Sequence, residues 1–76
     1  MTLTVDVSLY SYLRNDRFSR SDVRLRDGAT VTDLLHELKL TTEDVGTVMV
    51  NAKSGTFKQI LADGDRITLI PPIDGG

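Results

Sequence analysis

Hydrophobic and polar residues alternate along several stretches of the chain, which is the pattern of strands with one buried face. The longest alternation covers residues 3–9, and shorter ones cover residues 22–26, 47–50 and 66–70. We predict a strand at each. Residues 11–19 lack the alternation and are rich in Asn, Asp, Ser and Arg, so they are expected to form a wide loop between the first two strands. These two strands are predicted to pair as a hairpin.

A different spacing follows the second strand and predicts a helix that begins after Thr30 and runs to about Lys39. Thr30 is a good N-cap, and Asp33 favours the positive end of the helix dipole. The apolar positions recur at helical spacing on one face. They are Val31, Leu34, Leu35 and Leu38. Because only a sheet of the predicted size could cover this face, the sequence predicts an α+β domain.

Turn signals separate the remaining elements. They occur at residues 27–28, 51–55 and 63–65, where Gly, Asp and Asn gather. The predicted order is β-β-α-β-(short β)-β, with residues 1–70 as the domain. Side chains from the irregular segments are expected to complete the core. In the first loop these are Tyr12, Leu13 and Phe18, and before the last strand they are Phe57, Ile60 and Leu61.

Composition limits the kinds of chemistry available to the chain. Its 76 residues make one small domain with a thin core, and its lack of cysteine excludes disulfides and thiolate chemistry within the chain. Neither a membrane-spanning run nor a secretory leader is visible, so we expect a cytoplasmic protein without membrane attachment. The net charge of −2 divides into +2 over residues 1–26 and −4 over the rest. Nucleic-acid binding is not expected from this balance.

The last six residues, 71–76, form a distinctive tail with the sequence Pro-Pro-Ile-Asp-Gly-Gly. Pro71 and Pro72 cannot continue a sheet ladder and favour an extended direction. Fully extended, the tail would reach roughly 20 Å. Gly75 and Gly76 lack side chains, so a narrow channel could close around their backbone and bring the carboxylate of Gly76 to bound reagents. The tail is therefore predicted to deliver its terminal group into a partner.

Three features together resemble the MoaD/ThiS family of ubiquitin-like sulfur carriers. They are the order of elements, the segment Leu61–Asp65 before the final strand, and the Pro-Pro-Ile-Asp-Gly-Gly ending. The segment Val48–Asn51 also matches the family's third strand and following turn. The long first loop is most similar to the small subunit of molybdopterin synthase. The resemblance implies a ubiquitin-like β-grasp fold, a mixed sheet of four to five strands packed on one main helix.

The resemblance also implies a chemistry for the tail. An E1-like adenylyltransferase of the MoeB/ThiF type would use ATP and Mg²⁺ to adenylate Gly76, and a sulfur donor would convert the adenylate to a thiocarboxylate. The chain itself would bind no cofactor and no metal. The acceptor would be a molybdopterin synthase large subunit of the MoaE type, or another sulfur acceptor enzyme. Gly75 would allow access, and Pro71, Pro72 and Ile73 would position the tail.

Other residues are expected to contact the partner. Ile70 would lie on the outer face of the last strand, where it could join Met49 or Phe57 in an apolar docking patch. Asp74 departs from the small uncharged residue of many relatives and favours a basic contact in the partner's channel. Three other functions remain open from the sequence. Gly76 could be joined to lysines of target proteins, as in a ubiquitin-like modifier, the chain could carry sulfur for thiamine or another sulfur pathway, or it could be a non-covalent β-grasp interaction domain.

Overall fold

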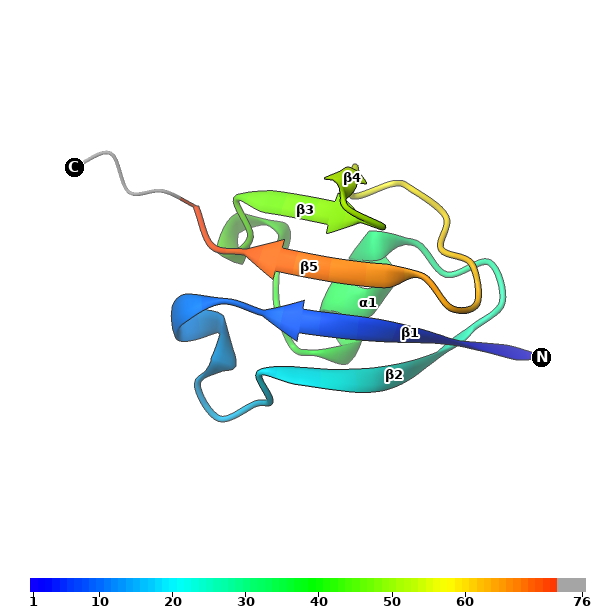
Figure 1. The fold of residues 1–76 in the computed structure, drawn as a ribbon, viewed down its shortest axis with the longest axis horizontal. Helices are drawn as coiled ribbons and strands as arrows, with labels where there is room; N and C mark the ends of the chain where they lie inside the picture. Colours follow the sequence, from blue (N-terminus) through cyan, green and yellow to red (C-terminus); the bar gives the residue numbers. More distant parts are fainter. Residues whose placement is uncertain (73–76) are drawn as a thin grey trace.

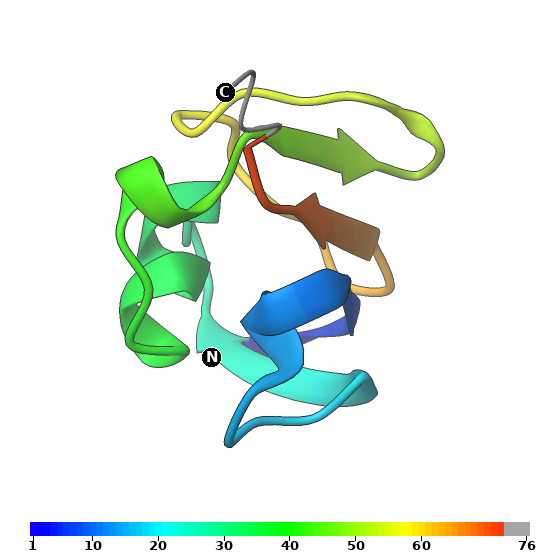
Figure 2. The same ribbon diagram turned by 90° about the vertical axis from the view of Figure 1, so that its left-hand side faces the viewer.

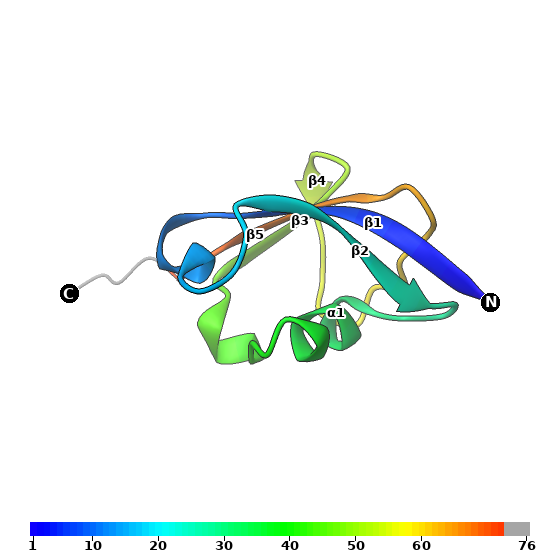
Figure 3. The same ribbon diagram turned by 90° about the horizontal axis from the view of Figure 1, so that it is seen from below.

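The computed structural model describes residues 1–72, which form a five-stranded mixed sheet with a helix on one face (Figures 1 and 3). The strands are β1 (Thr2–Leu9), β2 (Arg20–Arg26), β3 (Thr47–Val50), β4 (Lys53–Ser54) and β5 (Arg66–Ile70), and the helix is α1 (Val31–Glu37). The sheet order is β2-β1-β5-β3-β4, and β1 and β5 are parallel. This is the ubiquitin-like β-grasp topology predicted from the sequence.

The predicted hairpin is confirmed, and its register sorts the side chains by face. β1 and β2 pair antiparallel with Val5 opposite Val23, and β1 pairs with β5 with Val7 opposite Ile67. The odd-numbered residues of β1 are buried against α1, while its even-numbered residues lie on the outer face of the sheet. The core therefore lies between the sheet and the helix, and the other sheet face remains available for contacts.

α1 begins as predicted, at a capping box. The Asp33 N–H donates to Thr30 Oγ1 at 3.3 Å, and the Thr30 N–H donates to Asp33 Oδ2 at 2.9 Å. The hydrogen bond from the Thr30 backbone favours the ionised carboxylate and lowers the pKa of Asp33 below its ordinary value.

The predicted end of the helix is wrong by two residues, because α1 ends at Glu37. Lys39 has φ of 61°, and its N–H bonds to His36 O while the Leu40 N–H bonds to Leu35 O at 2.8 Å. This is a Schellman motif with lysine at the left-handed position. Glycine, the usual signal for that position, is absent, so the sequence pattern did not reveal the stop.

Two predicted core residues are exposed. The Ile60 side chain is 68% exposed, because the bridge between Thr30 and Ile60 directs it outward while the next residue, Leu61, is buried. Tyr12 is 52% exposed, since it lies on a short 3₁₀ helix, η1 (Ser11–Arg14), that turns Leu13 inward instead. Phe18 and Phe57 are half-buried against the core.

The turn before β5 is a network that ties three strands together. The Thr4 N–H donates to Asp63 Oδ1 at 2.8 Å, which holds the turn to β1. Asp65 accepts from the Ala62 N–H and from Asn51 Nδ2, both at 2.8 Å, and Asn51 Oδ1 accepts from the Arg66 N–H at 2.9 Å. These carboxylates therefore fix the start of β5, the strand that leads to the tail.

Candidate functional site: the tail exit and the outer face of the sheet

β5 delivers the chain to the surface at one end of the sheet, and the tail begins there (Figures 1 and 2). Pro71 is buried and Pro72 is exposed, so the transition from the domain to the tail falls between the two prolines. Prolines end the ladder, since neither has an N–H to donate. The predicted site residues Ile73, Asp74, Gly75 and Gly76 lie outside the described residues.

Gly46, just before β3, packs against the backbone at the tail exit. Its N–H donates to Ile70 O at 2.8 Å, which extends the β3–β5 pairing by one residue. A Cβ at this position would overlap the Cα of Pro72, and would lie 2.7 Å from Pro72 N and 3.1 Å from Pro71 C. Only glycine allows the backbone before β3 to pack this closely against the tail exit.

Sequence reasoning missed Gly46, although a signal for it was present. The glycine lies at the entry to a predicted strand, where glycine often marks a close approach of another backbone. What the sequence did not reveal was the approaching segment, because Gly46 and Pro72 are brought together only by the β3–β5 pairing.

The outer face of the sheet carries an apolar strip beside the tail exit. The β3–β5 register places Met49 opposite Thr68 and Thr47 opposite Ile70, and these pairs alternate with the buried pairs on the helix side. Met49, Thr68 and Ile70 are half-buried. The structure therefore brings the predicted docking residues Met49 and Ile70 to the same face, on neighbouring strands.

Phe57 lies elsewhere. Its carbonyl accepts hydrogen bonds from the Thr32 N–H at 3.0 Å and from Thr32 Oγ1 at 2.9 Å, at the start of α1. Its side chain packs against the core. Met49 and Phe57, the two residues predicted as neighbours of Ile70 in the docking patch, thus lie on opposite sides of the sheet, and the geometry favours Met49.

Two tyrosines next to the end of β5 were not among the predicted site residues. The Tyr10 N–H donates to Leu69 O at 3.2 Å, so the chain leaving β1 lies beside the end of β5. Tyr10 and Tyr12 are 54% and 52% exposed. The alternation pattern ends at Leu9, and nothing in the loop composition distinguished these aromatic rings as surface residues.

Away from the tail exit, the same face is charged. Asp6 accepts from Arg20 Nε at 3.0 Å and from its terminal nitrogen at 2.6 Å, an ion pair across β1 and β2. These hydrogen bonds hold the pKa of Asp6 below its ordinary value and raise the pKa of Arg20. Arg66 lies opposite Asp6 on the other side, across the β1–β5 pair.

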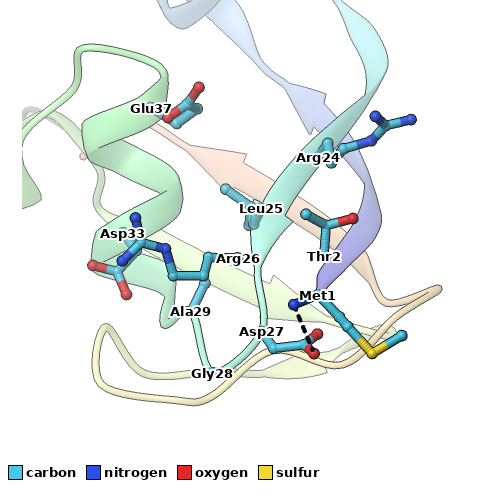
Figure 4. A pocket seen from close by; sticks show the side chains of 10 residues that line it. All are labelled: Met1, Thr2, Arg24, Leu25, Arg26, Asp27, Gly28, Ala29, Asp33 and Glu37. Atoms are coloured by element: carbon cyan, nitrogen blue, oxygen red, sulfur yellow. Dashed lines mark ion pairs between the residues drawn. The ribbon is translucent and has the colours of Figure 1, made fainter.

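Residues 1–72 contain acidic side chains and surface hollows that bear on metal and ligand binding. No group of three or more His, Cys, Asp or Glu side chains in this part of the chain is arranged to hold a metal ion. A hollow of about 950 Å³ lies between β2 and α1 and includes Met1 and Gly28 in its lining (Figure 4). Figure 1 shows the N-terminus at the opposite end of the sheet from the tail exit. None of the helices in residues 1–72 is long and apolar enough to cross a membrane.

Comparison with known proteins gives one family match and several structural matches. The ThiS family model matches residues 9–76. No curated protein is a significant match to the chain.

Three solved structures share the fold, all at low sequence identity. Small archaeal modifier protein 1 of Haloferax volcanii has a TM-score of 0.78 at 20% identity, covering 93% of this chain and 99% of that one. A protein described as putative molybdopterin converting factor subunit 1 of Pyrococcus furiosus has a TM-score of 0.75 at 23% identity, with 93% and 99% covered. A complex of subunits 1 and 2 of that factor from Helicobacter pylori gives 0.60 at 20% identity, covering 97% of this chain and 100% of the matched one.

Proposed function

The chain belongs to the ThiS family, and on that premise we propose that it is a ubiquitin-like sulfur carrier that donates sulfur from its Gly76. The observation that carries the proposal is the construction of the tail exit. β5 ends at Ile70, and the following Pro71 and Pro72 pack against Gly46 in a contact that no other residue would allow. A domain that fixes the start of its tail in this way is suited to presenting the end of that tail to another protein.

The chemistry proposed for Gly76 follows from the poor reactivity of a carboxylate. A carboxylate oxygen of Gly76 would attack the α-phosphorus of ATP, with Mg²⁺ bound by an E1-like adenylyltransferase, and pyrophosphate would leave. The resulting acyl-adenylate has AMP as a good leaving group. A hydrosulfide equivalent from a sulfur donor would then displace AMP and leave a thiocarboxylate. All of these steps take place on the activating partner, so this chain contributes the tail and the surfaces that present it.

For the acceptor, we propose the large subunit of a molybdopterin synthase. The similarity to the first subunit of molybdopterin converting factor supports this choice, as does the existence of a complex of both subunits in Helicobacter pylori. Met49, Thr68 and Ile70 on the outer face would dock on the acceptor, with Ile73 and Asp74 following the tail into it. The exposed rings of Tyr10 and Tyr12 border the same end of the sheet and would extend this contact.

A second candidate function uses the same activated tail. Small archaeal modifier protein 1 of Haloferax volcanii shares the fold, and this likeness favours conjugation of Gly76 to lysines of target proteins as the alternative. The two functions share the adenylation step and differ in the nucleophile that attacks afterwards. Hydrosulfide gives a carrier, and a lysine amine gives a modifier.

Intact mass spectrometry after alkylation of thiols tests the proposal. The chain contains no cysteine, so a thiol-specific label on it reports a thiocarboxylate. The protein is taken from its native host, and also incubated with an E1-like enzyme, ATP, Mg²⁺ and a sulfur donor. We expect one label, located on Gly76, and none on a variant that lacks Gly76. Adducts with other proteins through Gly76 would instead establish the modifier, and a chain that acquires neither would overturn both.

A further inference from the structure

β2 is an edge strand, and within residues 1–72 its outward backbone groups bond to no other strand, although the Asp22 carbonyl accepts a long hydrogen bond of 3.4 Å from the neighbouring Ser21 Oγ. The hydrogen bonds at the two ends of the β1–β2 ladder join odd-numbered residues. At one end the Asp27 N–H donates to Met1 O at 3.1 Å, and at the other the Leu9 N–H donates to Ser19 O at 2.9 Å. The even-numbered residues of β2 therefore direct their N–H and C=O groups away from the sheet. Asp22 and Arg24 thus present a ready set of donors and acceptors.

The two edges of the sheet differ in how far other segments cover the core beside them. On the β3–β4 side, the segment after β4 covers the core and is held there by two hydrogen bonds. The Gly55 N–H donates to Val48 O at 2.9 Å, and the Val31 N–H donates to Gln59 O at 3.1 Å. The β2 side has no comparable cover in the part of the chain that the structure describes. Three half-buried apolar residues contact the core along this side: Phe18, Val23 and Leu38. The core is therefore open along the seam between β2 and α1.

This β2–α1 seam is hollowed. Its larger hollow, of about 950 Å³, has the nearly buried side chains of Leu25 and Ala29 in its lining, with Arg26 on the strand side and Asp33 and Glu37 on the helix side (Figure 4). A second hollow of about 610 Å³ lies between the loop before β2 and the end of α1; Phe18 and Leu38 line it, and Glu37 lines both hollows. The seam thus has an apolar floor beside the second half of β2, where Arg24 and Leu25 line the larger hollow.

The side chains around the edge determine what could be added to it. An added strand would point alternate side chains into the seam and onto the outer face of the sheet. On the outer face the neighbours from β2 are Arg20, Asp22 and Arg24, whereas Arg26, at the end of the strand, extends into the larger hollow toward Asp33 (Figure 4). In that hollow the one cation of Arg26 faces the two carboxylates of Asp33 and Glu37, and this excess of negative charge disfavours acidic side chains, while the floor favours apolar ones. Acidic residues therefore fit only the outer positions.

We propose that the β2 edge and the β2–α1 seam bind an extended segment of another protein, in which acidic residues alternate with apolar ones, as an additional strand of the sheet. The backbone groups of Asp22 and Arg24 would pair with the segment, and Arg24 would face its acidic side chains. A second copy of this chain is a poorer occupant, because it would bring two arginine-rich strands together. β1 and β5 separate this edge from Met49, so the segment could bind while the tail is engaged elsewhere.

Titration of the full ¹⁵N-labelled chain with a short synthetic peptide of alternating glutamate and valine, capped at both ends, tests this proposal. We expect saturable binding, with the largest amide shifts and slowed hydrogen exchange at Asp22 and Arg24. A peptide with lysine in place of glutamate should bind at least about tenfold more weakly, because its cations would face the arginines. Arg24→Gln should weaken binding of the glutamate peptide about threefold, whereas Arg66→Gln, on the same face but away from the edge, should leave it unchanged.

A second pair of peptides isolates the backbone pairing without altering the protein. Methylating every second peptide nitrogen removes the donors on one side of the strand only. One of the two methylated peptides should lose binding, and the other should retain it. Equal binding of the glutamate and lysine peptides, shifts centred on Met49 and Ile70, or self-association of the chain in place of peptide binding would each overturn the proposal. So would an absence of binding, which would mean that the arginines only protect the edge from aggregation.

Discussion

At the tail exit, a residue without a reactive side chain can still be essential to the packing. Gly46 has no reactive group, yet its missing Cβ lets Pro72 pack against the entry to β3. Pro71 is buried directly before it, so the point where the tail leaves the domain is fixed by a buried ring and by the backbone contact at Gly46. If Gly76 carries sulfur as proposed, the residue that supports its delivery lies thirty positions away along the chain.

Replacing Gly46 by alanine should disturb the tail more than the domain. The added methyl group overlaps the Cα of Pro72, and relieving that overlap should cost about 1–3 kcal/mol and redirect the tail. We expect the rate of thiocarboxylate formation to fall about tenfold or more, since misplacing a reacting group by about 1 Å can cost about a hundredfold. Alkylation and intact mass spectrometry over time, with the E1-like enzyme limiting, give this rate.

The matched control is Gly28→Asn. Gly28 lies in the turn after β2, where φ is 85° and no other atom lies within 4 Å of the place a Cβ would take, and asparagine tolerates this conformation. It should change the rate of sulfur loading by less than about twofold. If Gly46→Ala is loaded as fast as the unmodified chain, the packing of Pro72 has no part in delivery.

At the scale of elements, α1 shows how a helix is ended without glycine. Lys39 takes the left-handed position of the Schellman motif, and Arg17 reinforces the end by donating to Leu38 O at 2.9 Å and to Lys39 O at 3.4 Å. A basic side chain at this end also suits the negative pole of the helix. The loop before β2 and the end of α1 are thereby joined.

Lys39→Gly should stabilise the domain by about 0.5–1 kcal/mol, because glycine adopts a positive φ without the steric cost that lysine bears. Arg17 bonds to the backbone carbonyl of this residue, so the substitution retains that contact. Urea unfolding followed by circular dichroism measures the change. The comparison is His36→Gly, the same type of substitution within the helix, which should destabilise by about 1 kcal/mol. Loss of stability in Lys39→Gly would contradict the assigned motif.

The elements were largely predictable, and the bounds of β3 and β5 agree with the predicted ones, whereas β2 begins two residues earlier and α1 ends two residues earlier than predicted. Alternation and helical spacing identified the strands and α1 because each buries one continuous face, and Thr30 with Asp33 marked the helix start. The helix end was missed because lysine replaces glycine there. Ile60 was placed in the core because apolar character alone does not tell which of two adjacent residues, Ile60 or Leu61, faces inward. In the site, Met49 and Ile70 followed from alternation, whereas Gly46 depended on a pairing between distant segments.

At the scale of the whole molecule, the fold separates its surfaces. The tail exit and the apolar strip of Met49, Thr68 and Ile70 lie on the β3–β5 half, and the charged outer residues and the free edge lie on the β1–β2 half. One half suits the proposed acceptor of the tail, and the other suits a second partner. Because β1 pairs with both β2 and β5 and so joins the two halves, its charged contacts contribute to the stability of the sheet.

Acid unfolding should reveal that contribution. Asp6 and Asp33 both have pKa values lowered in the folded chain, Asp6 chiefly by its hydrogen bonds to Arg20 and Asp33 chiefly by the Thr30 N–H. A carboxyl whose pKa is lowered by folding stabilises the protein above its unfolded pKa, of about 3.9, and loses that contribution as the pH falls through the folded value. The free energy of unfolding should therefore decrease from about pH 5 downward.

Urea unfolding at a series of pH values separates the two aspartates. Asp6→Asn should reduce the acid slope without removing it, because Asp33 still titrates. Arg20→Gln should have the same effect, since it removes the partner that lowers the pKa of Asp6, and the double variant should add little to either single change. High salt should also flatten the slope, as this ion pair is exposed on the outer face. An acid slope unchanged in both single variants would mean that the β1–β2 ion pair does not stabilise the sheet in solution.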